Sequence, residues 1–394
     1  KKILLSSPTM HNEEMKYIQE AFDRNWIAPL GFNCDGFEAE MVEYLKKAGT
    51  GYDGDLFSFA TVAGTAALHL AVKLADVKPG DHVLCSDLTF SATVNPVSYE
   101  GGIQVFVDSE HETWNMDPVA LEKAFEKYPD AKVVALAHLY GTPSKMDEIM
   151  AVCRKHDAIL IEDAAEALAA TYKGRACGTF GNVAALSYNG NKLITTSGGG
   201  MLLTNNKASR DKALFWATQS REPAPWYQHE EIGYNYRMSN VVAGIGRGQL
   251  KHINDHRKLK EKIYHRYEEG FKGLPIKMNP YLKNSCPNFW LSCLLIDSNV
   301  MCSCERTETT TKWKHEDGKS CPDEIAAKLN EANVETRPIW KPMHMQPFYA
   351  ENDFVSIENV GEDIFTRGLC LPSDIKMTEL EQDYVIEIIK ACFE

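Results

Sequence analysis

Apolar positions in the first two hundred residues form short continuous runs that alternate with helical spacings. The runs, each typical of a buried strand, are residues 82–85, 103–108, 132–138, 158–161 and 183–188. Apolar residues recur at helical spacing from Gly64 to Ala75, and Asp117 with Pro118 supplies an N-cap and a first-turn proline for another helix. A further helix is predicted over residues 145–156. Apolar strands joined by helical crossovers indicate an α/β protein whose mostly parallel sheet is covered on both faces.

The pattern changes near residue 250. A charged helix is predicted from about Leu250 to Leu274, followed by a strand within residues 289–296 and a helix over residues 322–332. We therefore expect a large domain over residues 1–250, including an N-terminal arm, and a smaller C-terminal α/β domain over residues 251–394. Residues 303–319 are polar and without periodicity, which predicts a loop and the most mobile segment of the chain.

Composition narrows the classes of protein. The 394 residues are 44% hydrophobic, which suffices for a large core, and the net charge of −13 contains no block of like charge. A broad nucleic-acid surface is therefore not expected. No run approaches the roughly 20 apolar residues of a membrane span, and the N-terminal residues do not resemble a signal peptide. The 11 cysteines, an odd number in a long chain, favour reduced thiols and a cytoplasmic location.

Several cysteines gather in the C-terminal part of the chain, namely Cys286, Cys293, Cys302, Cys304 and Cys321. Their spacings match no zinc or iron–sulfur pattern. We expect free thiols here and no metal.

Two segments suggest specific chemistry. Lys192 follows the run at 183–188 and precedes three glycines, and Asp163 lies at the end of the run at 158–161. A lysine amine can hold the aldehyde of pyridoxal phosphate as a Schiff base, and an acid can keep the pyridine nitrogen protonated. A buried carboxylate needs such a partner, because burying an unpaired charge is costly. The alternatives are a surface lysine and a helix N-cap or structural ion pair, and these leave the combined pattern unexplained.

Weaker signals surround this pair. Gly64, Thr65 and Ala66 open a helix after a strand, where free amides bind phosphate, and Ser187 is a second phosphate donor. Phe90 is a candidate for stacking on the ring. Glu166 is either a partner of the ring hydroxyl or the third residue of a plain helix start. Asn235 and Arg237, in a polar and aromatic segment, have no simple structural role.

These motifs together resemble the DegT/DnrJ/EryC1/StrS family of sugar aminotransferases, which belong to the fold-type I pyridoxal phosphate enzymes. The resemblance rests on residues 64–68, 162–166, 187–200 and 233–240, and it runs from residues 25–31 to 370–372. It implies that Lys192 bonds to the cofactor aldehyde and that Asp163 pairs with the pyridine nitrogen. It also implies a homodimer with shared active sites. The implied cofactor contacts are Gly64, Thr65, Ala66, Phe90, Asp163, Glu166, Ser187, Asn189, Lys192 and, from the neighbouring subunit, Asn235.

The resemblance also bears on the reaction. One branch of the family has histidine in place of the lysine and performs dehydration, so Lys192 favours transamination. Residues 188–200 and 335–344 are similar to a bacterial subgroup that transfers the amino group of L-glutamate to UDP-4-keto-6-deoxy-N-acetylglucosamine for glycan biosynthesis. The implied substrate contacts are Pro29, Leu30, Arg237, Arg337, Trp340, Lys341 and His344.

The residues leave two alternatives open. The first is an aminotransferase whose substrate is a GDP- or dTDP-linked ketosugar, and the second is a non-catalytic regulator that binds the cofactor. A regulator of that kind usually adds a basic DNA-binding domain, for which this acidic chain has no spare length or positive charge.

Overall fold

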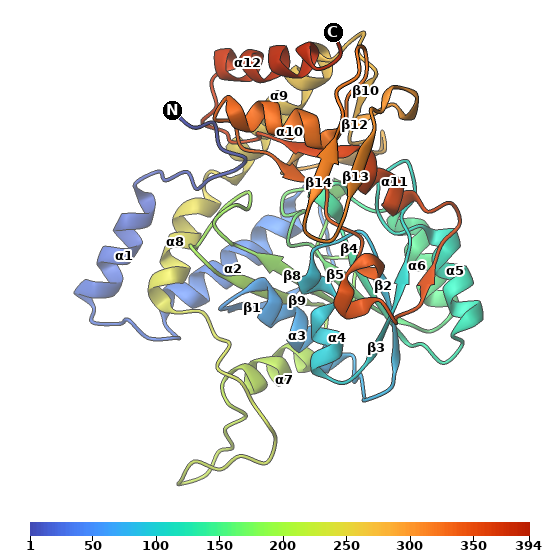
Figure 1. Ribbon diagram of the computed structural model, residues 1–394. Helices are drawn as coiled ribbons and strands as arrows, with labels where there is room; N and C mark the ends of the chain where they lie inside the picture. Colours follow the sequence, from blue (N-terminus) through green and yellow to red (C-terminus); the bar gives the residue numbers. More distant parts are fainter.

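An eight-stranded sheet forms the centre of the computed structural model, which describes residues 1–394 (Figure 1). Its strands lie in the order β1-β9-β8-β5-β4-β2-β3-β16. Only β9 runs antiparallel to its neighbours, so the sheet is mixed and mostly parallel, as predicted. The strands are β1 Phe57–Thr61, β2 His82–Ser86, β3 Ile103–Val107, β4 Val133–Ala137, β5 Ile159–Asp163, β8 Val183–Ser187, β9 Gly200–Thr204 and β16 Phe354–Val355.

Both faces of this sheet are buried, which explains why its strands are mostly apolar. Along β4, Val133 and Ala135 belong to one core cluster, while Val134 and Leu136 belong to another on the opposite face. The helices that enclose the sheet and the N-terminal part of the chain are α1 Glu13–Asp23, α2 Phe32–Lys47, α3 Gly64–Leu74, α4 Asn95–Tyr99, α5 Pro118–Lys127, α6 Met146–Lys155, α7 Lys207–Ala217 and α8 Asn240–Leu250.

Local capping places several of these helices where the sequence predicts them. The Asp117 side chain accepts a hydrogen bond from the amide of Val119, with Pro118 in the first turn of α5. Helix α3 begins at Gly64, three residues after the end of β1, and no side chain caps its first amides. The amides at this helix start therefore remain free for a ligand.

A second sheet defines the smaller C-terminal domain, which lies above the large sheet in Figure 1. It is antiparallel, with the order β10-β12-β17-β15, and its strands are β10 Ile276–Met278, β12 Ser292–Ile296, β15 Arg337–Pro338 and β17 Gly368–Leu371. Its helices are α9 Ile253–Gly270, α10 Pro322–Glu331, α11 Val360–Arg367 and α12 Glu379–Ala391. The helix predicted from Leu250 begins instead at Ile253, because α8 ends at Leu250 and a short turn separates the two.

The chain exchanges segments between the two sheets. Ile3 packs in the small-domain core and pairs with Val334, whereas Phe354–Val355 extends the large sheet beside β3. The division into domains at residue 250 therefore stays a prediction, because segments on each side of residue 250 pack in the other domain.

Residues 303–319 correct the expectation of a loop. They contain a β-hairpin, β13 Cys304–Arg306 and β14 Thr311–Trp313, turned by Thr307, whose Oγ1 accepts from the amide of Thr310 at 2.9 Å. The residues of β14 are all exposed, so no apolar alternation marks the hairpin in the sequence. The remaining short strands are β6 Thr171–Tyr172, β7 Arg175–Ala176 and β11 Ser285–Cys286, and the 3₁₀ turns are η1 Ser91–Thr93, η2 Leu139–Gly141, η3 Ser298–Val300, η4 Met343–Met345 and η5 Pro347–Tyr349.

One segment leaves the body of the molecule. Between α7 and α8 the chain extends far outward before it returns (Figure 1), and it exposes Trp226, Tyr227 and Ile232. None of the helices combines the length and the apolar composition needed to cross a membrane.

Candidate active site

A cavity of about 310 Å³ lies at the carboxyl ends of β4, β5 and β8. Ligands collect at this edge of parallel sheets, because loops and helix starts converge there. The cavity is lined by Ala63, Gly64, Thr65, Leu68, Thr89, Phe90, Ala92, Ala137, His138, Asp163, Ala165, Glu166, Ser187, Asn189, Asn191, Lys192, Gly198, Gly199, Trp290 and Trp340.

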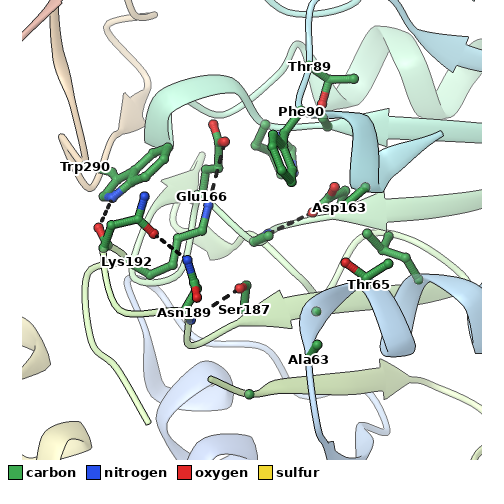
Figure 2. A pocket seen from close by; sticks show the side chains of 18 of the residues that line it. Ala63, Thr65, Thr89, Phe90, Asp163, Glu166, Ser187, Asn189, Lys192 and Trp290 are labelled. Atoms are coloured by element: carbon green, nitrogen blue, oxygen red, sulfur yellow. Dashed lines mark hydrogen bonds and ion pairs between the residues drawn. The ribbon is translucent and has the colours of Figure 1, made fainter. Parts of the chain in front are cut away.

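Lys192 reaches into this cavity from the loop after β8, and Figure 2 shows its side chain directed toward Glu166. Its Nζ lies 3.7 Å from Glu166 Oε1 and 4.0 Å from the centre of the Trp290 ring. The Trp290 indole donates at 2.6 Å to the carbonyl of Asn191, which fixes the backbone just before the lysine. With 13% of its side chain exposed, Lys192 is not an ordinary surface lysine.

Asp163 is buried at the end of β5 and has no cationic partner. Its Oδ2 accepts from the Thr93 hydroxyl at 2.7 Å, and its Oδ1 accepts from the amide of Ala165 at 3.0 Å. Burial raises the pKa of Asp163, and these hydrogen bonds offset the rise only in part. Turns, not a helix, follow β5, so the helix N-cap alternative for Asp163 is wrong. A pyridinium nitrogen is the kind of partner that this carboxylate lacks.

Glu166 lies in the same turn, so the helix-start alternative fails for it as well. Its Oε2 accepts from the amide of Tyr140 at 2.7 Å, while Oε1 faces Lys192. Burial raises the pKa of Glu166, and the neighbouring Lys192 lowers it in part. The carboxyl group can thus contact both the lysine and a ring hydroxyl.

The start of α3 forms a site that suits phosphate, because small residues leave space there and free amides attract an anion. A Cβ atom at Gly64 would lie 3.0 Å from Ser187 Cβ and 3.3 Å from Ser187 Oγ, so a larger residue would crowd this corner. The free amides and the positive end of the helix dipole favour an anion here. The hydroxyls of Thr65 and Ser187 line the same cavity.

The structure brings together most of the predicted cofactor contacts. Gly64, Thr65, Phe90, Asp163, Glu166, Ser187, Asn189 and Lys192 all line the cavity. Ala66 is buried one position further along α3 and does not line it, whereas Ala63 does. Asn235 lies at the base of the extended segment, where it pairs with Thr218, and outside the cavity of its own chain; its Oδ1 accepts from Gln219 at 3.3 Å.

The predicted substrate contacts are more scattered. Trp340 lines the cavity, its ring lies 5.3 Å from that of Phe90, and its buried indole nitrogen has no hydrogen-bond partner. Six others, Pro29, Leu30, Arg237, Arg337, Lys341 and His344, do not line the cavity of the single chain.

Three of those six have partners elsewhere in the chain. Arg237 lies 3.9 Å from Asp35, and Arg337 pairs with Glu335 at 2.7 Å. His344 has both ring nitrogens engaged, at 2.8 Å by Asp87 and at 3.0 Å by Glu362, which indicates a structural role.

Sequence reasoning missed Trp290, His138 and Thr93. Trp290 comes from the small domain, 98 positions after Lys192, so no local spacing connects the two. Thr93 lies three residues after Phe90, within the segment that suggested the ring stacker, and its role depends on the fold of that turn.

The residues of the cavity fit both ends of one pyridoxal phosphate molecule. The helix start at Gly64 accepts the phosphate, the unpaired Asp163 accepts the ring nitrogen, and the Trp340 indole is an unused donor at the wall. An α/β fold with this constellation defines a pyridoxal phosphate-dependent aminotransferase.

The chain belongs to the DegT/DnrJ/EryC1/StrS aminotransferase family, whose model matches residues 8–390. It is 43% identical over 401 residues to EpsN of Bacillus subtilis (strain 168), named as a pyridoxal phosphate-dependent aminotransferase, with 100% of this chain and 96% of EpsN covered. It is 32% identical to the GDP-perosamine synthase of Escherichia coli O157:H7, covering 99% of this chain and 98% of that one.

Solved structures confirm the fold. Helicobacter pylori PseC, an aminotransferase involved in the biosynthesis of pseudoaminic acid, superposes with a TM-score of 0.86 at 20% identity and covers 100% of this chain and 99% of its own. The fold-type I prediction and the pyridoxal phosphate cofactor are therefore confirmed.

Proposed function

We propose that this enzyme transfers the amino group of L-glutamate to C4 of a nucleotide-linked 4-keto-6-deoxy sugar, UDP-4-keto-6-deoxy-N-acetylglucosamine, for bacterial glycan biosynthesis. The convergence of Lys192, Asp163 and Glu166 in one cavity carries the proposal. The similarity to EpsN supports an aminotransferase, and the similarity to GDP-perosamine synthase supports a sugar as the amino acceptor.

Each end of the cavity holds one part of the cofactor. Thr65, Ser187 and the first amides of α3 bind the phosphate, and Asp163 holds a proton on the ring nitrogen. When bound, pyridoxal phosphate supplies a carbonyl carbon that takes up amines and a ring that accepts an electron pair.

Lys192 moves protons during both half-reactions. Its Nζ takes a proton from the α-carbon of L-glutamate in the first and delivers one to C4 of the sugar in the second. Glu166, at 3.7 Å, and the face of Trp290 hold that amine within the cavity. Because Asp163 is short of positive partners, it stabilises positive charge on the ring more than a solvated carboxylate would.

The wall of the cavity at Trp340 suits a sugar. The Trp340 ring lies 5.3 Å from that of Phe90, tilted by 50°, and offers an apolar surface, and the free indole N–H offers one donor. Arg337 is the first residue of β15, and Lys341 follows this strand. Both side chains are positively charged and would attract the diphosphate of a nucleotide sugar.

A GDP-linked ketosugar is the second candidate, because GDP-perosamine synthases of two further organisms are 33% and 30% identical to this chain. The two candidates differ in the base, whose recognition lies outside the cavity described above.

We also propose that the enzyme acts as a homodimer in the cytoplasm. The extended segment that carries Asn235 leaves the body of its own chain and exposes Trp226 and Tyr227, as expected for a segment that packs on a second copy. All 11 cysteines are free thiols, which suits a reducing compartment.

The absorption spectrum of the cofactor-loaded enzyme tests the reaction. L-Glutamate is expected to bleach the visible band, and the UDP-linked ketosugar is expected to restore it. Recovery with a GDP- or dTDP-linked ketosugar alone would retain the chemistry and change the substrate. Absence of bleaching by glutamate would contradict the proposal.

Mixed dimers test the shared site. Lys192→Ala is expected to abolish turnover, by on the order of 10⁴-fold or more, because it removes the proton carrier. Asn235→Ala is expected to weaken cofactor binding, so this variant is also inactive when the cofactor concentration is kept limiting. If Asn235 serves the neighbouring site, mixing the two inactive proteins restores activity, because each hybrid contains one intact site. A mixture that stays inactive, although differently tagged subunits co-purify and so have exchanged, would assign Asn235 to the site of its own chain and contradict the shared site.

A further inference from the structure

A second group of reactive side chains lies in the small domain, where the β13–β14 hairpin meets α10. The Cys304 thiol on β13, the Cys321 thiol just before α10 and the Asp323 carboxylate in its first turn have ligand atoms within 4.8 Å of one another. Cys304 Sγ lies 3.1 Å from Asp323 Oδ2. None of the three lines the active-site cavity.

We propose that Cys304, Cys321 and Asp323 bind one thiophilic divalent cation, zinc in the first instance, which ties the hairpin to α10. Structural zinc sites are tetrahedral and take thiolate sulfur and carboxylate oxygen, with Zn–S bonds of about 2.3 Å that set the sulfur atoms ~3.8 Å apart. Ligand atoms within 4.8 Å therefore need to close by about 1 Å at most.

The charges around the three ligands suit a cation of two positive charges. Arg306 Nε donates to Asp323 Oδ2 at 2.8 Å, and the Cys304 contact uses the same oxygen, so Oδ1 is available to a metal. Two thiolates and one carboxylate carry three negative charges, which zinc and the Arg306 guanidinium together neutralise. Binding releases the two thiol protons to the solvent.

The fold explains why the spacing concealed this site. Cys304 pairs with Trp313 across the hairpin, and Met301 pairs with Ser320 where the segment returns to α10. These two pairings bring residues that are seventeen positions apart in the chain to one place. Known zinc motifs space their ligands closely in the sequence, whereas here a hairpin separates them. The sequence therefore predicted free thiols and no metal, and only the fold shows that these ligands lie together.

The test uses the reduced holoenzyme, freed of metal by dialysis against a chelator, and titrates it with Co²⁺ and then Zn²⁺. One equivalent of Co²⁺ is expected to produce tetrahedral d–d bands at longer wavelength than the cofactor absorbs, and Zn²⁺ is expected to remove them. Cys304→Ser and Cys321→Ser are expected to weaken binding by at least tenfold. Cys286→Ser, a half-buried thiol on β11 outside the cluster, is the matched control and is expected to bind normally.

Two conservative variants separate the loss of metal binding from a loss of folding. Serine is a favoured N-cap, so Cys321→Ser retains the start of α10, and Asp323→Asn retains an oxygen for Arg306. Both are expected to keep their circular dichroism and turnover while losing the bands. Absence of stoichiometric binding, equal binding by Cys304→Ser and wild type, or a disulfide within the cluster in reduced protein would each overturn the proposal.

Discussion

Glu162 and Asp163 are neighbours on β5, both carboxylates are buried, and their surroundings are opposite. Glu162 accepts hydrogen bonds from His138 and from the amides of Gly178, Phe180 and Gly181. Burial raises the pKa of Glu162, but these donors, His138 foremost, outweigh it and lower the pKa. Asp163 has one hydroxyl and one amide, and burial raises its pKa.

This difference separates a structural carboxylate from a functional one. The protein itself satisfies Glu162, whereas Asp163 remains short of a positive partner that only a ligand supplies. Adjacent residues of a strand point to opposite faces of the sheet, which is why one strand end can serve both purposes.

Glu162→Gln is expected to have the largest effect, and the effect is on stability. The substitution breaks a buried pair with His138 and places an amide N–H₂ against amide donors, at a cost of about 3–5 kcal/mol. Urea denaturation of the cofactor-free protein measures this. Turnover per cofactor-loaded molecule should change little, and a variant as stable as wild type would contradict the structural role.

Asp163→Asn is expected to show the reverse. It removes the charge that faces the ring nitrogen, so kcat should fall by about 10²–10³-fold. The cofactor-free protein should unfold at the same or a higher urea concentration than wild type, because the buried unpaired charge is gone. A variant that loses activity only because it unfolds would show that Asp163 is structural.

The same comparison separates what the sequence predicts from what it does not. Apolar runs and capping residues predict five strands of the large sheet, β2, β3, β4, β5 and β8, and the helices α3, α5, α6, α9 and α10. The order of Lys192 and Asp163 predicts the cofactor. The hydrogen-bond partners of Glu162 come from residues 138 and 178–181, and the ring that lies against the Lys192 amine comes from residue 290. These contacts depend on how distant loops meet, and a local pattern contains no record of that. The hairpin at 304–313 was not predicted for another reason: an exposed polar strand has no alternation of apolar residues that the sequence could show.

The pH dependence of stability sharpens the assignment of the His138–Glu162 pair. Burial lowers the pKa of His138, but Cys177 and Glu162 outweigh burial and raise it to about 10 from the usual 6.5. A raised folded-state pKa gives stability that is complete below pH 6.5 and is lost as pH rises toward 10. The urea midpoint of the cofactor-free enzyme should therefore decline across this range. Glu162→Gln should flatten the decline, and an equally steep decline in that variant would rule out the pair as its source.

Trp290→Phe is expected to have the smallest effect and to test how the catalytic loop is held. Phenylalanine keeps an aromatic face against Lys192 and loses the indole donor to the Asn191 carbonyl, a bond worth about 1 kcal/mol. We expect a stability loss of that size and a few-fold lower kcat, with the KM for glutamate unchanged.

Trp340→Phe is the matched control, since the indole nitrogen of Trp340 has no partner within the chain. It should leave stability unchanged and raise the KM for the nucleotide sugar, because its N–H is free for the substrate. If both variants changed kcat and KM alike, the two tryptophans would merely fill the cavity wall. If they divide as expected, one wall of the cavity orients the lysine and the other binds the sugar, just as the two faces of β5 divide structure from chemistry.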